Sequence, residues 1–405
     1  MGNNLLSVWG TIGSVLLAIL ILLVMITVHE FGHWAAGKIL KFKIDEFSIG
    51  FGPALFKKKK KNGEVFSLRL IPLGGYCAFH GEDGLEEEKS LPVPFAETQE
   101  EEVQPAPVET EKSRKRVPEW KKKADDGSFT RKAPWKRIIV LLAGAFMNYV
   151  LALFLIMICF GAYGQVMLGV KEVDTESEYY QEFPDYCLKD GDVFLEAEGR
   201  KLYLTNDMAL ALKGKKEGDL ATLVVSRIVS EEGEPTVRKT MKITVKLRCD
   251  VQVKSSANTD VVWKALGVKD FGTHAVHFGF FETVGRSFVY SFKIAGSILR
   301  VIGELLTGKL GISALGGPVT TISMTSKIAS SSFRSFLEIA GFIGVNLAVF
   351  NLLPIPALDG SKIVFTIIEW VRGKPISRKV EAIIHAVGFV FLLGFAVLVD
   401  ILQFI

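Results

Sequence analysis

Charge is absent from the start of this chain: no Lys, Arg, Asp or Glu occurs between residues 1 and 28. An uncharged apolar run of this length can cross a bilayer, which takes about 20 residues. No basic segment precedes the run, and it is longer than the apolar part of a secretory signal peptide, so we expect it to be retained. Cysteine is scarce, with four in 405 residues, which excludes a disulfide-rich scaffold.

Three further apolar runs are long enough to span a membrane. Residues 138–170 and 339–358 carry no charged residue, and residues 382–399 carry only His385. Apolar residues make up 49% of the chain and the mean hydropathy is +0.31, which fits neither an ordinary soluble enzyme nor a chain made only of spans. We therefore predict a polytopic α-helical membrane protein with four transmembrane helices.

The net charge of +4 is small but unevenly distributed. Basic clusters lie between the first two runs and again between the last two, at residues 57–61, 112–116, 121–123, 136–137 and 372–379. Because these clusters flank spans, the positive-inside rule explains them better than nucleic-acid binding does, and we expect no nucleic-acid partner. Both basic loops then lie in the cytoplasm, and both termini and residues 171–335 lie outside.

This topology also predicts the state of the cysteines. Cys77 falls in a cytoplasmic loop and Cys159 in a span, so neither should be oxidised. Cys187 and Cys249 both fall outside, where they could pair, but free thiols are the favoured interpretation.

The first apolar run ends in the motif His29-Glu30-Phe31-Gly32-His33. Two histidines four residues apart share one face of a helix and can bind a single zinc ion, and the glutamate between them then lies beside the metal-bound water as a general base. A surface helix with two histidines is the alternative. Ionisable residues at membrane depth are costly and usually functional, so we favour the zinc site.

Two histidines and a water leave tetrahedral zinc one ligand short. The third apolar run ends in the sequence NLLPIPALDG, at residues 351–360, whose two prolines should break the helix and free its backbone groups. Asp359 lies at the same end of its run as His29 and His33 do of theirs, so we predict it as the third ligand. A helix-capping role for Asp359 is the alternative. The remaining histidines lie outside the spans or, for His385, alone near the end of one.

Other segments indicate smaller elements. Residues 47–53 and 65–76 are β-prone with Gly and Pro at their ends, which predicts a hairpin close to the membrane, or alternatively a plain loop. The charged residues between 282 and 304 fall within roughly 40° of one another on a helix, so we expect this helix to lie in the membrane surface. Asn148 follows the small residues Ala143 and Gly144, and helix packing and a role near the active site are equally open for it.

Together these motifs resemble the site-2 protease family of intramembrane zinc proteases, and most closely its bacterial branch that carries a PDZ domain and cleaves membrane-bound anti-sigma factors. The resemblance implies that His29, His33 and Asp359 hold zinc and that Glu30 activates water. It implies substrate-binding roles for four further residues: Asn351, Pro354, Gly50 and Gly52. Asn351 and the nearby prolines would seat an unwound substrate segment. Residues 50–52 and 71–75 match the family's membrane-associated β element, which presents substrate as an added strand, and within it the strand at residues 47–52 would handle the substrate.

The sequence LKDGDVF at residues 188–194 matches part of a PDZ domain, and Gly316-Gly317-Pro318 matches a family element ahead of the third span. Two features depart from the family pattern: Gly144-Ala145 replaces a Gly-Pro pair before Asn148, and the peptide-carboxylate loop near residues 167–170 is poorly matched.

The expected fold is thus four transmembrane helices, a membrane-associated β element and one extracytoplasmic PDZ-like α+β domain. The expected layout begins with transmembrane helix 1 and its HExxH motif at 1–37, the β element at 38–80 and a disordered cytoplasmic insertion at 81–132. Transmembrane helix 2 at 133–164 and the PDZ-like domain at 165–265 follow. The last segments are the interfacial amphipathic helix at 280–306, transmembrane helix 3 with the LDG motif at 335–360 and transmembrane helix 4 at 380–405.

The expected function is a zinc-dependent intramembrane endopeptidase of the bacterial cytoplasmic membrane, acting in regulated intramembrane proteolysis. Its substrates would be single-span membrane proteins such as anti-sigma factors or remnant signal peptides, trimmed first by an upstream site-1-type protease. The alternative is a non-catalytic membrane scaffold with a PDZ-like binding domain. A scaffold has no need for the full set of His29, Glu30, His33 and Asp359. A metal transporter is a third and weaker hypothesis, because a transporter needs polar or ionisable residues along several spans and these spans have few.

Overall fold

The structure is a computed structural model that describes residues 2–82, 127–176, 180–181, 187–229, 237–252, 260–311 and 315–404. Most of the expected insertion, residues 83–126, lies outside the described residues. The chain divides into two compact units, which we describe separately. The first comprises Met1–Val150, Gly317–Ser326 and Leu347–Ile401, and the second comprises Leu151–Gly316, Lys327–Asn346 and Leu402–Ile405.

Four helices within the described residues are long and apolar enough to cross a membrane. They are α1 (Gly2–Ile39), α2 (Pro134–Tyr163), α8 (Phe333–Leu352) and α10 (Arg378–Phe404). Large apolar side chains such as Leu16, Phe154 and Phe391 are exposed on them, a surface that suits lipid rather than water. The predicted polytopic membrane protein with four spans and additional β structure is confirmed.

The third span is shorter than predicted. The sequence predicts a helix over 335–360, but α8 ends at Leu352, and Asp359 is the first residue of a separate helix, α9 (Asp359–Arg372). Pro354 and Pro356 lie between the two helices and cannot donate the backbone hydrogen bonds that would continue α8. The predicted ligand therefore begins a helix instead of ending a span.

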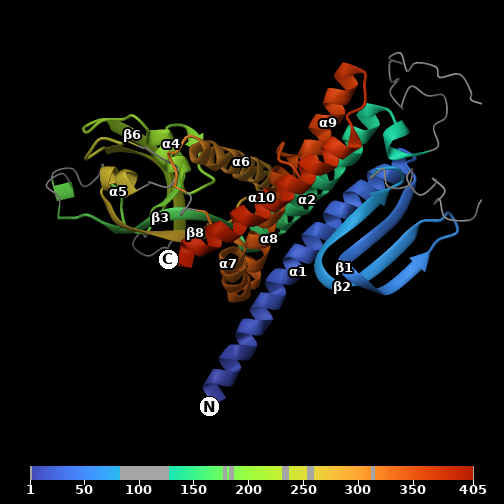
Figure 1. The fold of residues 1–405 in the computed structure, drawn as a ribbon. Helices are drawn as coiled ribbons and strands as arrows, with labels where there is room; N and C mark the ends of the chain where they lie inside the picture. Colours follow the sequence, from blue (N-terminus) through green and yellow to red (C-terminus); the bar gives the residue numbers. More distant parts are fainter. Residues whose placement is uncertain are drawn as a thin grey trace, which may run out of the picture. The chain divides into compact units, whose positions relative to one another are not determined.

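The predicted hairpin consists of β1 (Ile44–Lys59) and β2 (Val65–Phe79), which pair antiparallel and lie beside α1 (Figure 1). Both strands bend, so residues 47–49 pair with residues 66–68 on one side and with residues 75–77 on the other. For residues 47–49, the expectation of an exposed, substrate-receiving edge is therefore wrong. Ser48 is fully buried, and the edges of the element are residues 54–59 and 71–77.

Two sets of contacts attach this hairpin to its surroundings in the first unit. The rings of Phe42, Phe79 and Phe129 pack together with centroids 5.6 Å apart; Phe129 belongs to the short helix η3 (Phe129–Arg131). On the other side, the buried Glu64 carboxylate accepts hydrogen bonds from Trp34 Nε1 at 2.6 Å and Lys38 Nζ at 2.7 Å. Both donors lie on α1, Trp34 directly after the HEFGH motif and Lys38 about one turn further on, so the hairpin is fixed to the helix that carries the histidines.

The first unit also contains the start of α7 (Pro318–Ser331), which follows the Gly316-Gly317-Pro318 sequence. The Asp400 carboxylate of α10 accepts hydrogen bonds from the backbone N–H groups of Val319 and Thr320. A Cβ atom on Gly317 would lie 2.3 Å from that carboxylate. Asp400 thus caps α7, and glycine at 317 leaves room for it.

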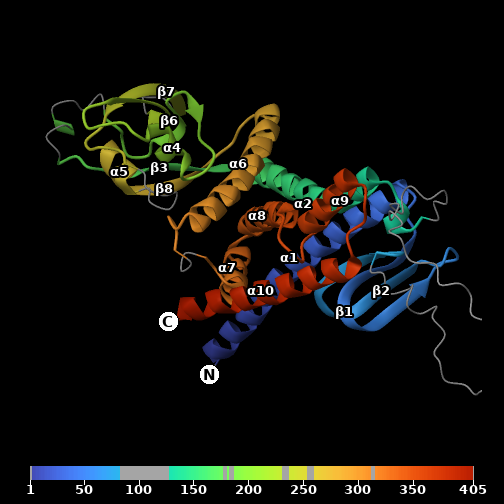
Figure 2. The ribbon, with the colours of Figure 1, turned by 45° about the horizontal axis from the view of Figure 1, so that its top comes forward.

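The second unit is built on a sheet in the order β7-β6-β4-β3-β8, with β5 paired to β4. Figure 2 labels β3, β6, β7 and β8 of this sheet. Its elements are β3 (Gln165–Val173), β4 (Val193–Ala197), β5 (Arg200–Lys201), α4 (Asp207–Leu212), β6 (Leu220–Val229), β7 (Val237–Lys246), α5 (Asp260–Leu266) and β8 (Val268–Val276). Phe194, Leu212, Leu223 and Val262 lie in its fully buried core. Because β8 pairs along β3, the domain extends beyond the predicted boundary at residue 265.

The predicted amphipathic helix is α6 (Phe280–Leu306). Its charged stripe faces the sheet domain: Arg286 Nη1 donates to Gln165 Oε1 at 3.0 Å, and Lys293 pairs with Asp207 at 2.8 Å. Phe281 and Leu306 lie among the exposed residues of the helix. Arg286 and Lys293 of the charged stripe are thus paired with the domain, and an apolar face remains uncovered within the second unit.

Candidate metal centre

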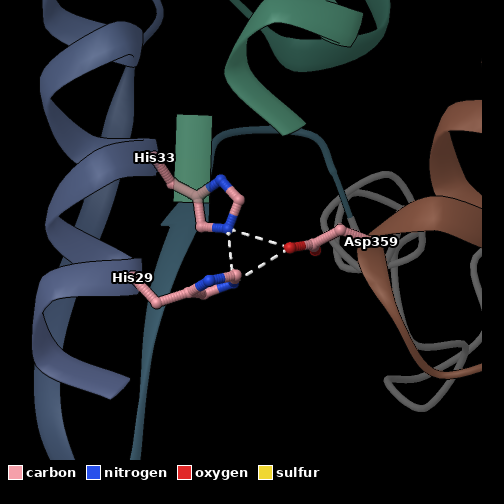
Figure 3. A group of neighbouring side chains, drawn as sticks. All are labelled: His29, His33 and Asp359. Carbon is pink, nitrogen blue, oxygen red and sulfur yellow. Dashed lines mark hydrogen bonds and ion pairs between the residues drawn. The ribbon is translucent and has the colours of Figure 1, made fainter. Parts of the chain in front are cut away.

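The structure brings together the three residues predicted as metal ligands, all of which belong to the first unit. His29 and His33 lie one turn apart on α1 and are buried, and Asp359 projects toward them from the start of α9 (Figure 3). The Nε2 atoms of His29 and His33 are 3.1 Å apart. Asp359 Oδ2 lies 3.0 Å from Nε2 of His29 and 3.1 Å from Nε2 of His33.

This arrangement fits a zinc ion. Two imidazole nitrogens and one carboxylate oxygen converge on a single point, and these are donor atoms that zinc prefers. Zinc bonds of about 2.0–2.1 Å place tetrahedral ligand atoms roughly 3.3 Å apart, close to the observed separations. Among the described residues, this is the one group of three or more His, Cys, Asp or Glu side chains that could hold a metal.

Each histidine also has a partner on its other ring nitrogen. His33 Nδ1 donates to the carbonyl oxygen of Val140 at 2.8 Å. His29 Nδ1 lies 3.5 Å from the side-chain amide of Asn148, whose Oδ1 is buried and lacks a partner among the described residues. Turning that amide over would let Oδ1 accept the proton of His29 Nδ1. Both Nδ1 atoms would then carry protons and both Nε2 atoms would be free to bind metal.

The sequence is compatible with either helix packing or a role near the active site for Asn148, and the structure places Asn148 beside His29. The small residues ahead of it have a related effect. A Cβ atom on Gly144 would lie 2.4 Å from His33 Nε2, and one on Gly32 would lie 2.3 Å from the carbonyl oxygen of Ala143. Glycine at these two positions allows α2 to pack directly against the histidine-bearing face of α1.

The β element runs close to the glutamate of the motif. A Cβ atom on Gly75 would lie 3.4 Å from Glu30 Cγ and 2.8 Å from the carbonyl oxygen of Ser48. The edge segment at residues 71–77 therefore passes alongside Glu30.

The four predicted substrate-binding residues all belong to the first unit. Gly50 and Gly52 have φ values of +85° and +83°, and they allow β1 to bend. Asn351 lies in the last turn of α8 and Pro354 in the loop that follows. The structure joins none of the four to the His29, His33 and Asp359 side chains by a hydrogen bond.

Two carboxylates of the β element carry strong electrostatic interactions. Burial alone would raise the pKa of Glu64, but hydrogen bonds from Lys38 and Trp34 outweigh it and lower the pKa to about 2. Burial would likewise raise the pKa of Glu46, but bonds from Ser67 and Arg69 lower it. Both groups are therefore ionised at neutral pH, and their charges help to hold the hairpin's shape beside α1.

A buried His-His-carboxylate cluster with a glutamate between the histidines, on a helix that can cross a membrane, defines the class of a membrane-embedded zinc metallopeptidase. The chain belongs to Peptidase family M50, the site-2 protease family, whose family model matches residues 17–395.

Relatives support the same assignment. The chain is 32% identical to a Clostridium perfringens protein described as a zinc metalloprotease, over 96% of this chain and 97% of the relative. It is 27% identical to the regulator of sigma-W protease RasP of Bacillus subtilis, over 94% and 96%. It is 28% identical to the protease eep of Enterococcus faecalis, over 95% and 97%. The protein is a zinc-dependent intramembrane protease of the site-2 type, as the sequence predicted.

Proposed function

We propose that His29, His33 and Asp359 hold the zinc ion, that Glu30 is the general base, and that the enzyme cuts membrane-spanning segments of single-span proteins in regulated intramembrane proteolysis. The observation that carries this proposal is the convergence of two Nε2 atoms and one carboxylate oxygen within 3.0–3.1 Å of one another. Bound zinc would polarise the scissile carbonyl and acidify a water molecule.

The protein's own groups perform the remaining steps. Glu30 follows His29 directly on α1, and its carboxylate takes a proton from the attacking water and returns it to the leaving amine. Val140 and Asn148 hold the two imidazole rings in position. The carbonyls of an intact substrate helix are hydrogen-bonded and shielded, so the substrate must first unwind.

We propose that the β element of β1 and β2 keeps the substrate segment unwound. The edge segment at residues 71–77 pairs with β1 on one side and lies beside Glu30 through Gly75. An extended substrate can add to such an edge through main-chain hydrogen bonds. Gly50 and Gly52 shape the bend that positions this edge. Asn351, in the last turn of α8, and Pro354, in the loop before Asp359, seat the unwound segment.

We further propose a sidedness for the two kinds of loop and a class for the sheet domain. The basic loops lie in the cytoplasm, and the sheet domain of the second unit is extracytoplasmic and PDZ-like. The PDZ assignment rests on the LKDGDVF segment. In this segment Asp192 is fully buried, accepts the Lys189 backbone N–H at 2.9 Å and pairs with Arg227 at 2.6 Å, contacts that fix the turn before β4. The uncovered apolar face of α6 suits a helix that lies in the membrane surface.

The substrate class proposed here is a membrane-bound anti-sigma factor, trimmed beforehand by a site-1-type protease. The similarity to a Bacillus subtilis protease named as a regulator of sigma-W supports it. Remnant signal peptides, which are also short single-span segments, are a second substrate class of the same chemistry. The location is the bacterial cytoplasmic membrane.

Glu30→Gln tests the proposal, because glutamine keeps the size of glutamate but cannot accept a proton. We expect the variant to keep its zinc and to lose cleavage of a single-span substrate by at least about 100-fold. Glu172→Gln, at an exposed carboxylate of β3, is the matched control and should cleave normally. Unchanged turnover in Glu30→Gln would remove Glu30 from its role, and a wild-type protein without cleavage activity would favour the scaffold.

A further inference from the structure

The loop that delivers Asp359 contains an unfavourable backbone conformation. Residues 353–358 join α8 to α9, and within them Ala357 has a φ of 75°. This left-handed region is disfavoured for every residue with a Cβ atom, and alanine has no side-chain hydrogen bond with which to compensate. Ala357 lies two residues before Asp359, so the turn sets the direction from which the carboxylate approaches His29 and His33.

Helix α10 holds this turn at two adjacent points. The backbone N–H of Ala357 donates to Nδ1 of His385 at 2.9 Å. One turn further along α10, Pro356 packs so closely on Gly388 that a Cβ atom there would lie 2.2 Å from the proline Cβ. The His385 ring also meets the Phe365 ring of α9 edge-on, with centroids 5.7 Å apart. The turn, α9 and α10 are all parts of the first unit.

The hydrogen bond determines the state of His385. A backbone N–H can only donate, so Nδ1 accepts and carries no proton, and the ring proton of the neutral imidazole lies on Nε2. The only acceptor nitrogen of neutral His385 is therefore bonded to the backbone of the loop at Ala357.

We propose that His385 is a positioning residue for zinc binding: its Nδ1 fixes the left-handed turn at Ala357 and thereby aims Asp359 at the two histidines. The proposal rests on the proposed function, in which Asp359 is a ligand. Groups that orient a metal ligand from outside its coordination shell commonly change metal affinity by about 10–100-fold when removed. His385 orients the ligand through two backbone units, so an effect at the lower end of that range is expected.

The test compares two substitutions of His385 that differ in the acceptor. His385→Leu removes it, whereas His385→Asn offers Oδ1 at the position of Nδ1, bonded to the same side-chain carbon. Full-length protein in detergent is loaded with zinc, and the rate of zinc transfer to a chelator is measured. We expect His385→Leu to lose zinc about tenfold faster than wild type, and His385→Asn to stay close to wild type. Equal rates for all three proteins would overturn the proposal.

A second substitution separates positioning from packing. Ala357→Gly removes the Cβ atom that disfavours the left-handed turn, so the loop depends less on the hydrogen bond. In the Ala357→Gly background, His385→Leu should therefore accelerate zinc loss by much less than tenfold. A His385 that acted only by packing against Phe365 would give the same acceleration in both backgrounds, and that result would also overturn the proposal.

Asp359→Asn serves as the reference in the same assay. Should it hold zinc as tightly as wild type, the proposed ligand set itself fails. Should Asp359→Asn lose zinc while His385→Leu releases it at the wild-type rate, the ligand set stands and only the positioning role is wrong. If His385→Leu does not fold, His385→Asn still tests the proposal, because zinc loss from it about tenfold faster than from wild type would overturn the role of the Nδ1 acceptor.

Discussion

At the scale of single residues, the site depends on side chains that are absent as much as on those that are present. Gly144 of α2 faces the two imidazole rings, and a methyl group there would overlap His33 Nε2 at 2.4 Å. Either the helices separate or the ring turns away, and a misplacement of about 1 Å can cost roughly 100-fold in rate. The closeness of α1 and α2 is therefore part of the active site.

We predict that Gly144→Ala lowers the zinc content of the purified protein and reduces cleavage of a single-span substrate by about 100-fold. Gly161→Ala is the matched control on the same helix, because no atom lies within 4 Å of the new Cβ position. Zinc content and activity should be normal in the control. Full zinc occupancy in Gly144→Ala would show that α2 is not in direct contact with the histidines.

The Glu64 carboxylate gives a pH-dependent contribution at the same scale. Its pKa is lowered from the ordinary 4.5 to about 2, so the ionised form stabilises the folded protein. This stabilisation is fully present above pH 4.5 and is lost as the pH falls toward about 2. We predict that the thermal unfolding midpoints of wild type and Glu64→Gln converge over this interval on acidification. A constant difference between the two proteins would contradict the assigned ion pair with Lys38.

At the scale of elements, the β hairpin differs most from the sequence expectation. The sequence predicts residues 47–49 as part of an edge strand, but they are paired on both sides, because β1 and β2 each bend and fold back. The free edge nearest Glu30 is residues 71–77, and the opposite edge is residues 54–59. A substrate strand can add to either in principle, but only the first lies beside the motif.

We therefore predict that a cysteine at Ile71 forms a disulfide with a cysteine placed near the scissile bond of a substrate, in the Glu30→Gln background. A cysteine at Leu55, on the opposite edge, is the control and should react much less. The side chain of Ile71 is 46% exposed and that of Leu55 is 65% exposed. Solvent accessibility alone would therefore favour reaction at the control position Leu55. Preferential reaction at Leu55 would assign substrate to the other edge.

Among these elements, local sequence patterns predict the features that lie within one helix or one turn. The HEFGH motif lies on one helix and its spacing alone places both histidines on one face, while the prolines before Asp359 signal a helix break. The paired state of residues 47–49, the addition of β8 to the sheet, and the contacts of Gly144 and His385 depend on long-range pairing and on the points where helices cross. Local patterns of residue type carry no information on those crossings.

At the scale of the whole molecule, sidedness rests on the charge of the loops. The lysine run that ends β1 should lie in the cytoplasm, and the sheet domain should lie outside. In a background without Cys77, Cys159, Cys187 and Cys249, all of which are free thiols, we predict that a cysteine at Lys60 is shielded from a membrane-impermeant thiol reagent in intact cells. A cysteine at Lys216 should react. The opposite labelling pattern would reverse the proposed orientation.

The central claim, that a single zinc ion is held by His29, His33 and Asp359, is tested most directly by X-ray absorption at the zinc edge on the full-length protein, with Asp359→Asn for comparison. We expect a first shell of nitrogen and oxygen atoms at about 2.0–2.1 Å with scattering from two imidazoles, and a weakened or lost zinc signal in Asp359→Asn. A sulfur atom at about 2.3 Å, or a wild-type spectrum from the Asp359→Asn protein, would contradict it.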